Sequence, residues 1–414
     1  MGDDHEFDIV LWGATGFTGQ LTAEQLLRRV GVDGEIRWAL GGRNADKLKS
    51  VRSDIGAAVG IDTDGLALVV GDSLDEDFVD ELARRTRVVC STVGPYATYG
   101  SELVAACARN GTDYCDLTGE VQWMQRMIDG FGHVAAESGA RIVFTCGFDC
   151  IPSDLGVYFM QQQMQQRHGL AARKLSYRVD GFSGGASGGT IASMLTMLDE
   201  ADEDPDVSRI LDDPYALNPK GERSGPDRSE RSAPFHDEDF DQWVAPFVMA
   251  AINTKVVRRT NALLDYTYGT GFKYNEGMLM GSGPIGLSKA AATSAGTAAM
   301  NAAMSVGWLR RSVSGRLPQP GQGPSPDKQE KGFFDIRLLA VHPSDPHQSM
   351  FGRVAGDRDP GYGSTSKMLA ESAICLATDD LDVGGGCWTP ASAMGDQLLE
   401  RLPVHAGVTF TLDD

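Results

Sequence analysis

Residues Ile9-Val10-Leu11-Trp12-Gly13-Ala14-Thr15-Gly16-Phe17-Thr18-Gly19 decide the fold of this chain. An apolar strand runs there into a turn with the spacing G-x-x-G-x-x-G, and a helix is predicted to begin near Gly16. Gly13 permits the tight turn, Gly16 lets the backbone approach a pyrophosphate, and Gly19 lets the helix pack close to the strand. Because the helix N-terminus offers free N–H groups and a positive dipole end, the stretch predicts a dinucleotide site. Its predicted contacts are Gly13, Thr15, Gly16, Phe17, Thr18 and Gly19.

The end of the second predicted strand, at 36–40, indicates which dinucleotide binds. An NAD site has Asp or Glu at this position, where the carboxylate hydrogen-bonds the ribose 2′-hydroxyl. This chain has Gly42-Arg43 instead, and the planar guanidinium of Arg43 is suited to pair with a 2′-phosphate. Lys47, one turn into the next helix, adds a second positive charge. The strand end therefore favours NADP(H) over NAD(H).

Three later strands are predicted to bring further cofactor contacts to the same edge. The strand at 66–70 ends in Gly71-Asp72, where a carboxylate often meets the adenine end. The strand at 87–93 is closed by Gly94-Pro95-Tyr96, and that turn is expected beside the nicotinamide ribose, because such folds bind ligands at the carboxyl edge of the sheet. A strand at 114–117 leads into Thr118-Gly119-Glu120. The predicted contacts from these turns are Asp72, Val93, Gly94, Pro95 and Gly119.

Composition excludes several classes of protein. A chain of 414 residues is long enough for two or three domains. The net charge of −20 and the pI near 4.7 argue against a nucleic-acid partner and against docking on anionic membranes. The acidic first residues do not have the pattern of a signal peptide. The cysteines are odd in number and contain no C-x-x-C pair, which is typical of reduced thiols in the cytoplasm.

The order of the predicted elements indicates two domains. Residues 1–152 alternate strand and helix, which predicts a Rossmann-like, doubly wound parallel sheet. Helices within 361–414 are expected to return and complete this NADP-binding domain. Residues 153–360 are predicted to form an inserted α+β domain for substrate binding or oligomerisation, with a mostly antiparallel sheet.

Within the inserted domain, strands are expected near 254–260 and 263–270, and a hairpin from 333–342 and 349–356. Residues 202–241 are interpreted as a long surface excursion or lid, and 317–331 as a Pro/Gly-rich loop. Residues 284–312 are rich in Ala, Ser, Gly and Met. They predict either a packed helix or a surface that meets lipid or acyl chains, and no apolar run there is long enough to span a membrane.

Short motifs follow one another along the chain: Gly13-Ala14-Thr15-Gly16-Phe17-Thr18-Gly19, Gly42-Arg43, Gly94-Pro95-Tyr96, Asp116-Leu117-Thr118-Gly119-Glu120, Gly147-Phe148-Asp149-Cys150-Ile151-Pro152-Ser153-Asp154, Gly361-Tyr362-Gly363-Ser364-Thr365 and Trp388-Thr389-Pro390-Ala391. In this order they resemble the saccharopine dehydrogenase-like oxidoreductases, and more closely their trans-acting enoyl reductase branch. The resemblance covers essentially the whole chain. It implies NADP(H) and a nucleotide domain into which a second domain is inserted.

The two branches of this family imply different substrates. The enoyl reductase branch resembles proteins that reduce a double bond in an acyl chain for a polyketide synthase lacking that domain, in complex-lipid synthesis. The amino-acid branch joins a semialdehyde to glutamate, and its several substrate carboxylates demand arginines in the second domain. Arg258 and Arg259 are adjacent on a predicted strand, so they would point to opposite faces. The acyl interpretation is therefore preferred, with a polyketide synthase or an acyl carrier protein as partner.

Reduction of an enoyl thioester needs a hydrogen-bond donor for the enolate oxygen and an acid for Cα. Tyr96 is the first choice as donor, with ring packing on the cofactor as its alternative, and Tyr99 is a weaker choice. Cys150 is the third predicted catalytic residue, with a buried structural thiol as its alternative. Other residues considered for the pocket are Asp149, Asp154, Thr190 and Lys273. No metal is expected, because the turn of His342, Asp345 and His347 has poor ligand spacing.

Two rival functions remain open. One is an oxidoreductase of an imine or amino-acid substrate, and the other is a non-catalytic NADP(H)-binding protein at lipid surfaces. A cytoplasmic location is expected, with a peripheral position at a membrane as an alternative, and a homodimer is compatible with the sequence.

Overall fold

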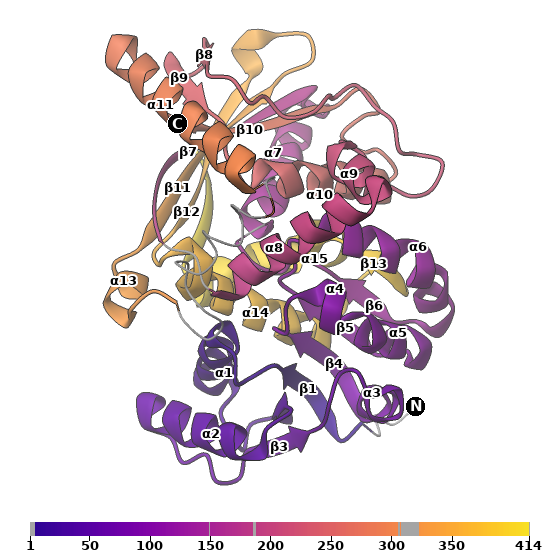
Figure 1. The fold of residues 1–414 in the computed structure, drawn as a ribbon. Coiled ribbons are helices and arrows are strands. Elements are labelled where there is room, and N and C mark those ends of the chain that lie inside the picture. Colours follow the sequence, from indigo (N-terminus) through magenta and orange to yellow (C-terminus); the bar gives the residue numbers. More distant parts are fainter. Residues whose placement is uncertain (1–4, 149, 185–187, 305–306, 308–322, 414) are drawn as a thin grey trace.

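Two seven-stranded sheets organise the computed structural model, which describes residues 5–148, 150–184, 188–304, 307 and 323–413. Sheet A is parallel throughout, in the order β13-β6-β5-β4-β1-β2-β3 (Figure 1). The predicted doubly wound sheet is therefore confirmed. Its strands are β1 (Phe7–Trp12), β2 (Trp38–Gly42), β3 (Ala67–Val70), β4 (Thr86–Ser91), β5 (Asp113–Asp116), β6 (Arg141–Val143) and β13 (Gly386–Trp388).

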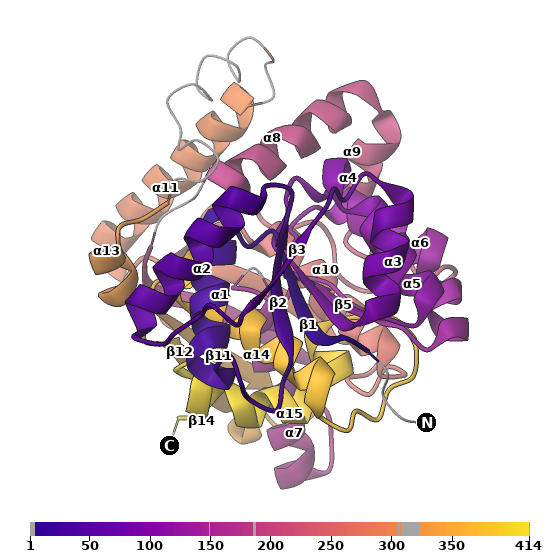
Figure 2. The same cartoon turned by 90° about the horizontal axis from the view of Figure 1, so that it is seen from below.

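Both faces of sheet A are covered by helices because its strands are apolar on both sides. Ile9 and Leu11 of β1 pack in one core cluster, and Val10 and Trp12 pack in another on the opposite face. Figure 2 shows the two helical layers on either side of these strands. One layer has α1 (Phe17–Val30), α2 (Ala45–Val59) and α14 (Thr365–Thr378), and the other has α3 (Glu76–Arg85), α5 (Ser101–Asn110) and α6 (Val121–Ser138).

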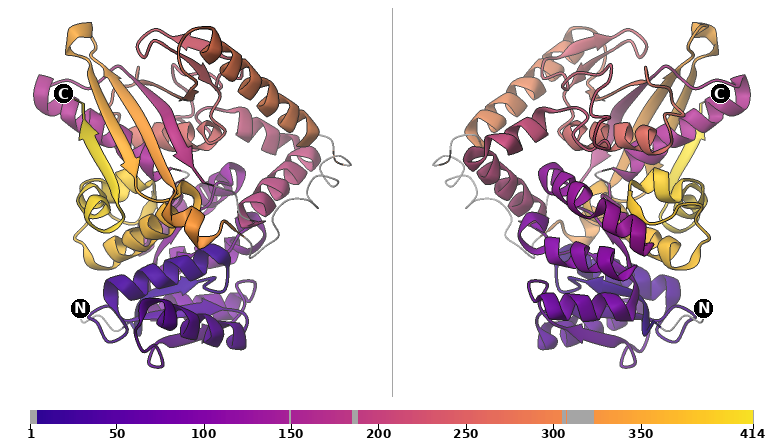
Figure 3. Two further views of the ribbon diagram at one scale, coloured as in Figure 1. Left: turned by 90° about the vertical axis from the view of Figure 1, so that its left-hand side faces the viewer. Right: turned by 90° about the vertical axis from the view of Figure 1, so that its right-hand side faces the viewer.

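Sheet B belongs to the second part of the chain and has the order β14-β12-β11-β7-β10-β9-β8. All its pairings are antiparallel except that of β7 with β10, so the predicted mostly antiparallel sheet is confirmed. Figure 3 shows sheet B above the nucleotide-binding part of the chain, and Figure 1 shows that it lies at the end away from β3. Its strands are β7 (Lys174–Ser183), β8 (Phe235–Asp237), β9 (Gln242–Ala245), β10 (Lys273–Leu279), β11 (Phe333–Val341), β12 (Met350–Gly356) and β14 (Val408–Leu412).

The C-terminal segment returns to sheet A, as predicted, but it also completes sheet B. Helix α14 packs on α1, where Glu371 accepts a 2.5 Å hydrogen bond from Arg29, and β13 pairs with β6. Helix α15 (Pro390–His405) then packs on α7 (Ile151–His168), and β14 pairs with β12. The domain bounds 1–152, 153–360 and 361–414 stay a prediction. Residues 361–414 were expected to complete only the nucleotide-binding domain, whereas β14 within them joins sheet B.

Several elements of the second domain differ from expectation. The strands predicted near 254–260 and 263–270 are wrong, because residues 250–263 form helix α10 (Ala250–Leu263) and turns follow it. The excursion at 202–241 contains α9 (Pro205–Asp212) and β8, and Leu217 within it is fully buried. Helix α11 (Gly283–Met304) covers most of 284–312, and α13 (Pro326–Glu330) lies in the predicted loop; residues 305–306 and 308–322 lie outside the described part. The hairpin of β11 and β12 is confirmed.

Every cysteine is a free, buried thiol, in agreement with the predicted reduced state. Among the described helices, none combines the length and the apolar character that crossing a membrane would require.

Candidate active site

The turn after β1 has the geometry that a dinucleotide needs. Gly13 has a φ of 93°, a conformation in which a residue with a Cβ is strained. A Cβ on Gly19 would lie 2.2 Å from the carbonyl oxygen of Gly13, so α1 reaches the turn only with glycine at this position. The amide of Gly16 donates to the same oxygen at 2.9 Å and closes the turn. Gly13, Gly16 and Gly19 therefore form a cradle of bare backbone, and side chains at Gly13 and Gly19 would fill it.

The N-terminus of α1 adds donors to this cradle. Gly16 is its N-cap residue, and no side chain in the described part of the chain caps the helix there. Thr15, Phe17 and Thr18 lie half-buried at the same turn, and the Phe17 ring meets the edge of Tyr362 with 5.2 Å between centroids. Free amides at a helix N-terminus attract phosphate groups, so the residues present fit a pyrophosphate.

Arg43 lies beyond the end of β2, as predicted, and its side chain is exposed. The guanidinium carbon is 5.6 Å from the centre of the Tyr99 ring, a contact that orients the planar group. No acid pairs with Arg43 within the described ranges, so its donors are available to a ligand. Asn44 caps α2 by accepting from the Lys47 amide at 2.9 Å, and the Lys47 side chain is exposed one turn further on.

The remaining predicted contacts lie at the carboxyl edge of sheet A. A Cβ on Gly13 would lie 2.6 Å from Cγ2 of Val93, so the turn after β4 touches the turn after β1. These turns flank the topological switch point, since β1 lies between β4 and β2. Gly94 and Pro95 continue this turn, Gly119 follows the neighbouring strand β5, and Asp72 follows β3 on the adenine side. Their contacts with a cofactor stay predictions.

Tyr96 lies at this edge, but its hydroxyl is turned into the protein. The residue is 3 % exposed, its ring packs on Trp123 and its hydroxyl donates to the carbonyl oxygen of Ser91 at 3.1 Å. Burial raises the pKa of the phenol well above its usual value. This geometry favours the packing role over donation to a substrate. Tyr99 is half-buried and supports Arg43.

The motif that starts at Asp116 holds the turns together through two carboxylates, Asp116 and Glu120, which were not predicted as site residues. Asp116 is fully buried and accepts from the amides of Thr118 and Thr145 at 3.1 Å and 3.0 Å. Burial raises its pKa to about 7. Glu120 is 1 % exposed and accepts from the amides of Tyr96 and Ala97, both at 2.8 Å. The sequence did contain a signal for these residues, because two carboxylates stand at the end of an apolar strand and in the turn after it.

Helix α8 (Gly188–Glu203), labelled in Figure 1, reaches this edge from the second part of the chain. Thr190 at its start lies 3.2 Å from Tyr362, hydroxyl to hydroxyl, and not at an N-cap position. One turn later, Oγ of Ser193 lies 3.1 Å from where a Cβ on Gly94 would stand. Glu200 forms a 2.5 Å ion pair with Arg126 of α6. Helix α8 therefore packs beside the turn after β4, at the switch point of sheet A.

Cys150 is fully buried before the first turn of α7, at the edge of a polar network between the domains. Its sulfur lies 3.5 Å from Oδ1 of Asn253, and the amide nitrogen of Asn253 donates to Glu276 at 3.0 Å. Glu276 also accepts from the Tyr274 hydroxyl at 2.7 Å, and burial raises the pKa of this carboxyl group to about 7. A structural thiol accounts for these contacts.

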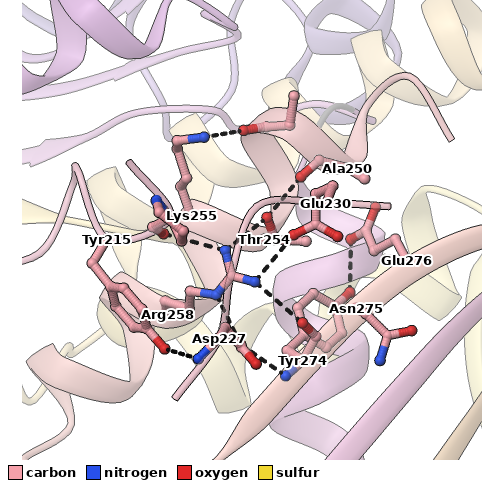
Figure 4. A network of polar contacts seen from close by, with 12 residues as sticks. Tyr215, Asp227, Glu230, Ala250, Thr254, Lys255, Arg258, Tyr274, Asn275 and Glu276 are labelled. Atoms are coloured by element: carbon pink, nitrogen blue, oxygen red, sulfur yellow. Dashed lines mark hydrogen bonds and ion pairs between the residues drawn. The ribbon is translucent and has the colours of Figure 1, made fainter. Parts of the chain in front are cut away.

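The predicted strand position of Arg258 and Arg259 is wrong, because both lie on α10. Figure 4 shows Arg258 at the centre of a polar network in which its guanidinium binds Asp227 at 3.0 Å and Glu230 at 3.1 Å. Arg259 donates to two backbone carbonyl oxygens at 2.5 Å. The β-branched residues of α10 resemble a strand in sequence, but tertiary packing overrides this propensity. Both arginines are committed to the protein and do not present free charge to a substrate.

The other residues considered lie apart from the crevice or outside the described part. Asp149 lies outside the described residues. Asp154 is buried and accepts from the Thr260 hydroxyl at 2.5 Å. Lys273 is exposed at the start of β10, in sheet B. Nδ1 of His342 accepts two amide hydrogen bonds, from Ser344 and Asp345, within its turn.

A parallel sheet with a glycine cradle at its switch point, and a helix from the second part of the chain packed beside it, define a dinucleotide-dependent oxidoreductase. Residues 9–174 match the model of the saccharopine dehydrogenase NADP binding domain, which confirms NADP(H) as the predicted cofactor. The chain belongs to the trans-acting enoyl reductase family. It is 43 % identical to a putative trans-acting enoyl reductase of Mycobacterium tuberculosis over 98 % of this chain and 97 % of the relative.

Other relatives agree with this assignment. A trans-acting enoyl reductase of Mycobacterium ulcerans is 37 % identical, and the match covers 96 % of both chains. Among solved structures, the chain resembles apo saccharopine dehydrogenase (L-Glu forming) of Saccharomyces cerevisiae, with a TM-score of 0.50 and 11 % identity over 98 % of this chain and 99 % of that chain. This likeness shows the shared fold, and the resemblance inferred from the motifs is confirmed.

Proposed function

We propose that the protein is an NADPH-dependent enoyl reductase that saturates the α,β double bond of an acyl or polyketide thioester in lipid biosynthesis. The observation that carries the proposal is the similarity to trans-acting enoyl reductases, which extends over nearly the whole chain. The second domain therefore belongs to the same family as the nucleotide domain.

In this proposal the cradle of Gly13, Gly16 and Gly19 holds the pyrophosphate, and Arg43 with Lys47 holds the 2′-phosphate. Thr15, Phe17 and Thr18 line the turn, Asp72 lies on the adenine side, and Val93, Gly94, Pro95 and Gly119 border the nicotinamide end. The bound dinucleotide supplies the hydride for Cβ of the substrate. The protein positions the thioester in the crevice beneath α8 and supplies the proton for Cα.

The substrate is proposed to arrive on a carrier. The relatives are named trans-acting, which fits an enzyme that serves a separate polyketide synthase or acyl carrier protein. A thioester carried in this way needs an apolar wall, and α8 has Met194, Leu195, Met197 and Leu198 half-buried along it. We place the reaction in the cytoplasm.

The saccharopine-type alternative is less well supported by the site. A substrate with several carboxylates needs free cations in the second domain, whereas Arg258 is held by Asp227 and Glu230. A non-catalytic NADP(H)-binding role is the second alternative. A turnover assay distinguishes enoyl reduction, amino-acid or imine chemistry and binding without catalysis.

The test is NADPH oxidation by the full chain with crotonyl and long-chain enoyl thioesters of coenzyme A and of acyl carrier protein. Control reactions contain 2-oxo acids with amines. We expect oxidation only with the enoyl thioesters, together with the saturated product in equal amount. Oxidation only in the 2-oxo acid reactions would assign the amino-acid chemistry, and NADPH binding without turnover in any reaction would assign a binding role.

A further inference from the structure

We infer that sheet B holds a second ligand site, which binds an amphiphilic anion: one carboxylate or phosphate group with an apolar chain. The site is centred on Arg337 of β11, in a cleft where the face of sheet B turned away from α7 meets the last turn of that helix. None of the residues that line the cleft belongs to the dinucleotide site. The inference goes beyond the proposed function and does not depend on it, because the ligand is bound and not transformed.

Three arginines stand side by side on neighbouring strands of sheet B. Arg337 is the direct partner of Arg178 on β7 and of Arg353 on β12, and these three strands are adjacent (Figure 1). Directly paired residues point to the same face, and like charges in such pairs destabilise a sheet. Arg178 is compensated by Asp237 at 2.7 Å, and Arg353 is compensated by Asp335. Arg337 has no acidic partner among the described residues, so the row carries an uncompensated charge at its centre.

Two aromatic rings hold the Arg337 guanidinium in place. Its central carbon lies 5.2 Å from the centre of the Phe240 ring and 6.0 Å from the centre of the Phe351 ring. Ring faces attract cations, and stacking leaves the N–H groups at the edge of the guanidinium plane able to donate. Because Arg337 is half-buried, its charge has lost part of its hydration without an acid to balance it. An anionic ligand would offset this loss.

The cleft beside Arg337 has a volume of about 360 Å³ and brings further donors to the same place. Arg167, near the end of α7, lines it with a second guanidinium, and no acid pairs with Arg167 in the parts of the chain that the structure describes. Ser349 adds a hydroxyl whose oxygen accepts the His342 amide at 3.1 Å, so its hydrogen can be donated to a ligand. Two guanidinium groups and a hydroxyl match a carboxylate or a phosphate, which accept several hydrogen bonds at once.

The rest of the cleft lining indicates that the ligand has an apolar part. Met350, Phe351 and Leu412 lie there, and the volume falls in the range of roughly 300–1,000 Å³ that is typical of small-molecule pockets. Asp413 also lines the cleft, and its amide donates to the Phe351 carbonyl oxygen at 3.0 Å, which fixes the backbone at this point. Since the Asp413 carboxylate repels a second negative group, a ligand with one anionic end and a hydrocarbon chain fits the cleft.

The test is isothermal titration calorimetry of the full chain with octanoate, octyl phosphate, octanol and inorganic phosphate. Saturating NADPH is present throughout, so that the phosphate-binding cradle is occupied. We expect octanoate or octyl phosphate to bind, and octanol and inorganic phosphate to bind at least tenfold more weakly, because each of these lacks one half of the ligand. Binding of octanoate assigns the site to a free carboxylic acid, and binding of octyl phosphate alone assigns it to a phosphate ester.

Variants place the binding at this cleft. Arg337→Gln should weaken it about tenfold or more, since a hydrogen bond between charged groups is lost. Arg337→Lys should give an intermediate loss, because it keeps the charge without the planar fork. The matched control is Arg173→Gln, which removes an exposed arginine beside β7 that does not line the cleft and should bind as the wild type does. Asp413→Asn removes the repelling charge and should strengthen binding about two- to fivefold.

Melting temperatures separate a ligand site from a structural role. Arg337→Gln relieves the repulsion from Arg178 and Arg353, so it should melt no lower than the wild type, and octanoate or octyl phosphate should stabilise the wild type but not this variant. The inference is overturned by a wild type that binds neither ligand, by binding that Arg337→Gln leaves unchanged, or by equally tight binding of inorganic phosphate. Where Arg337→Gln fails to fold, unchanged binding in Asp413→Asn overturns it. These results leave the proposed function intact, because none of them involves turnover.

Discussion

Arg43→Ala tests the choice of NADPH over NADH. The guanidinium of Arg43 is exposed, lies 5.6 Å from the centre of the Tyr99 ring and has no acidic partner within the described ranges. Its donors are thus available to a 2′-phosphate without first breaking an ion pair. A hydrogen bond to a charged group contributes about 1.5–3 kcal/mol, which corresponds to roughly a 10- to 150-fold change in dissociation constant.

The assay is fluorescence titration of the wild type and Arg43→Ala with NADPH and with NADH at one fixed ionic strength. We expect the NADPH dissociation constant to rise within that range and the NADH constant to stay the same. Arg43→Lys is the matched control, since it keeps the charge without the planar fork and should give an intermediate loss. Equal wild-type affinity for both cofactors, or an equal loss for both in the variant, would refute the assignment of Arg43.

Three further predictions follow from buried contacts. Gly19→Ala places a Cβ 2.2 Å from the Gly13 carbonyl oxygen and should cost about 1–3 kcal/mol of stability together with NADPH binding; a normal melting temperature and affinity would contradict the close approach of α1. Tyr96→Phe removes the hydrogen bond to the Ser91 carbonyl oxygen at 3.1 Å and the longer one that the hydroxyl accepts from the Leu117 amide at 3.5 Å. It should therefore cost about 0.5–1.5 kcal/mol in denaturant unfolding and leave kcat unchanged, whereas a collapse of kcat would return Tyr96 to the donor role. Burial raises the pKa of Asp154 to about 7, so the folded state holds a proton that the unfolded chain releases. The free energy of unfolding should therefore decline as pH rises from about 4 to 7, and Asp154→Asn should make this decline shallower; an unchanged slope in urea titrations would contradict the shift.

The nucleotide half of the site could be predicted because its signals are local. Each strand end and the turn after it are contiguous in sequence, and a parallel sheet brings all those ends to one edge. Gly13 has a positive φ, and Gly19 approaches the Gly13 carbonyl oxygen too closely for a Cβ, so the glycine pattern could be recognised from the sequence alone.

The contacts made by helix α8 were not predictable in the same way. Ser193 is one small polar residue on a helix of the second domain, and it reaches Gly94 only through the packing of that domain on sheet A. Tyr96 stood at the right place in sequence, but the direction of its hydroxyl depends on Trp123 and Ser91. The strand predicted at 254–260 was wrong because tertiary packing buries α10 on all sides. A helix buried on all sides does not show the alternation of apolar and polar residues by which a helix is recognised in a sequence.

The most direct measurement of the central claim is transfer of deuterium from NADPH deuterated at C4 to an enoyl thioester, followed by mass spectrometry of the product. The account predicts one deuterium at Cβ of the saturated thioester, from one of the two C4 positions only, and one solvent-derived hydrogen at Cα. Absence of the label from every enoyl thioester, with the label recovered instead at the amine-bearing carbon formed from a 2-oxo acid and an amine, would contradict it.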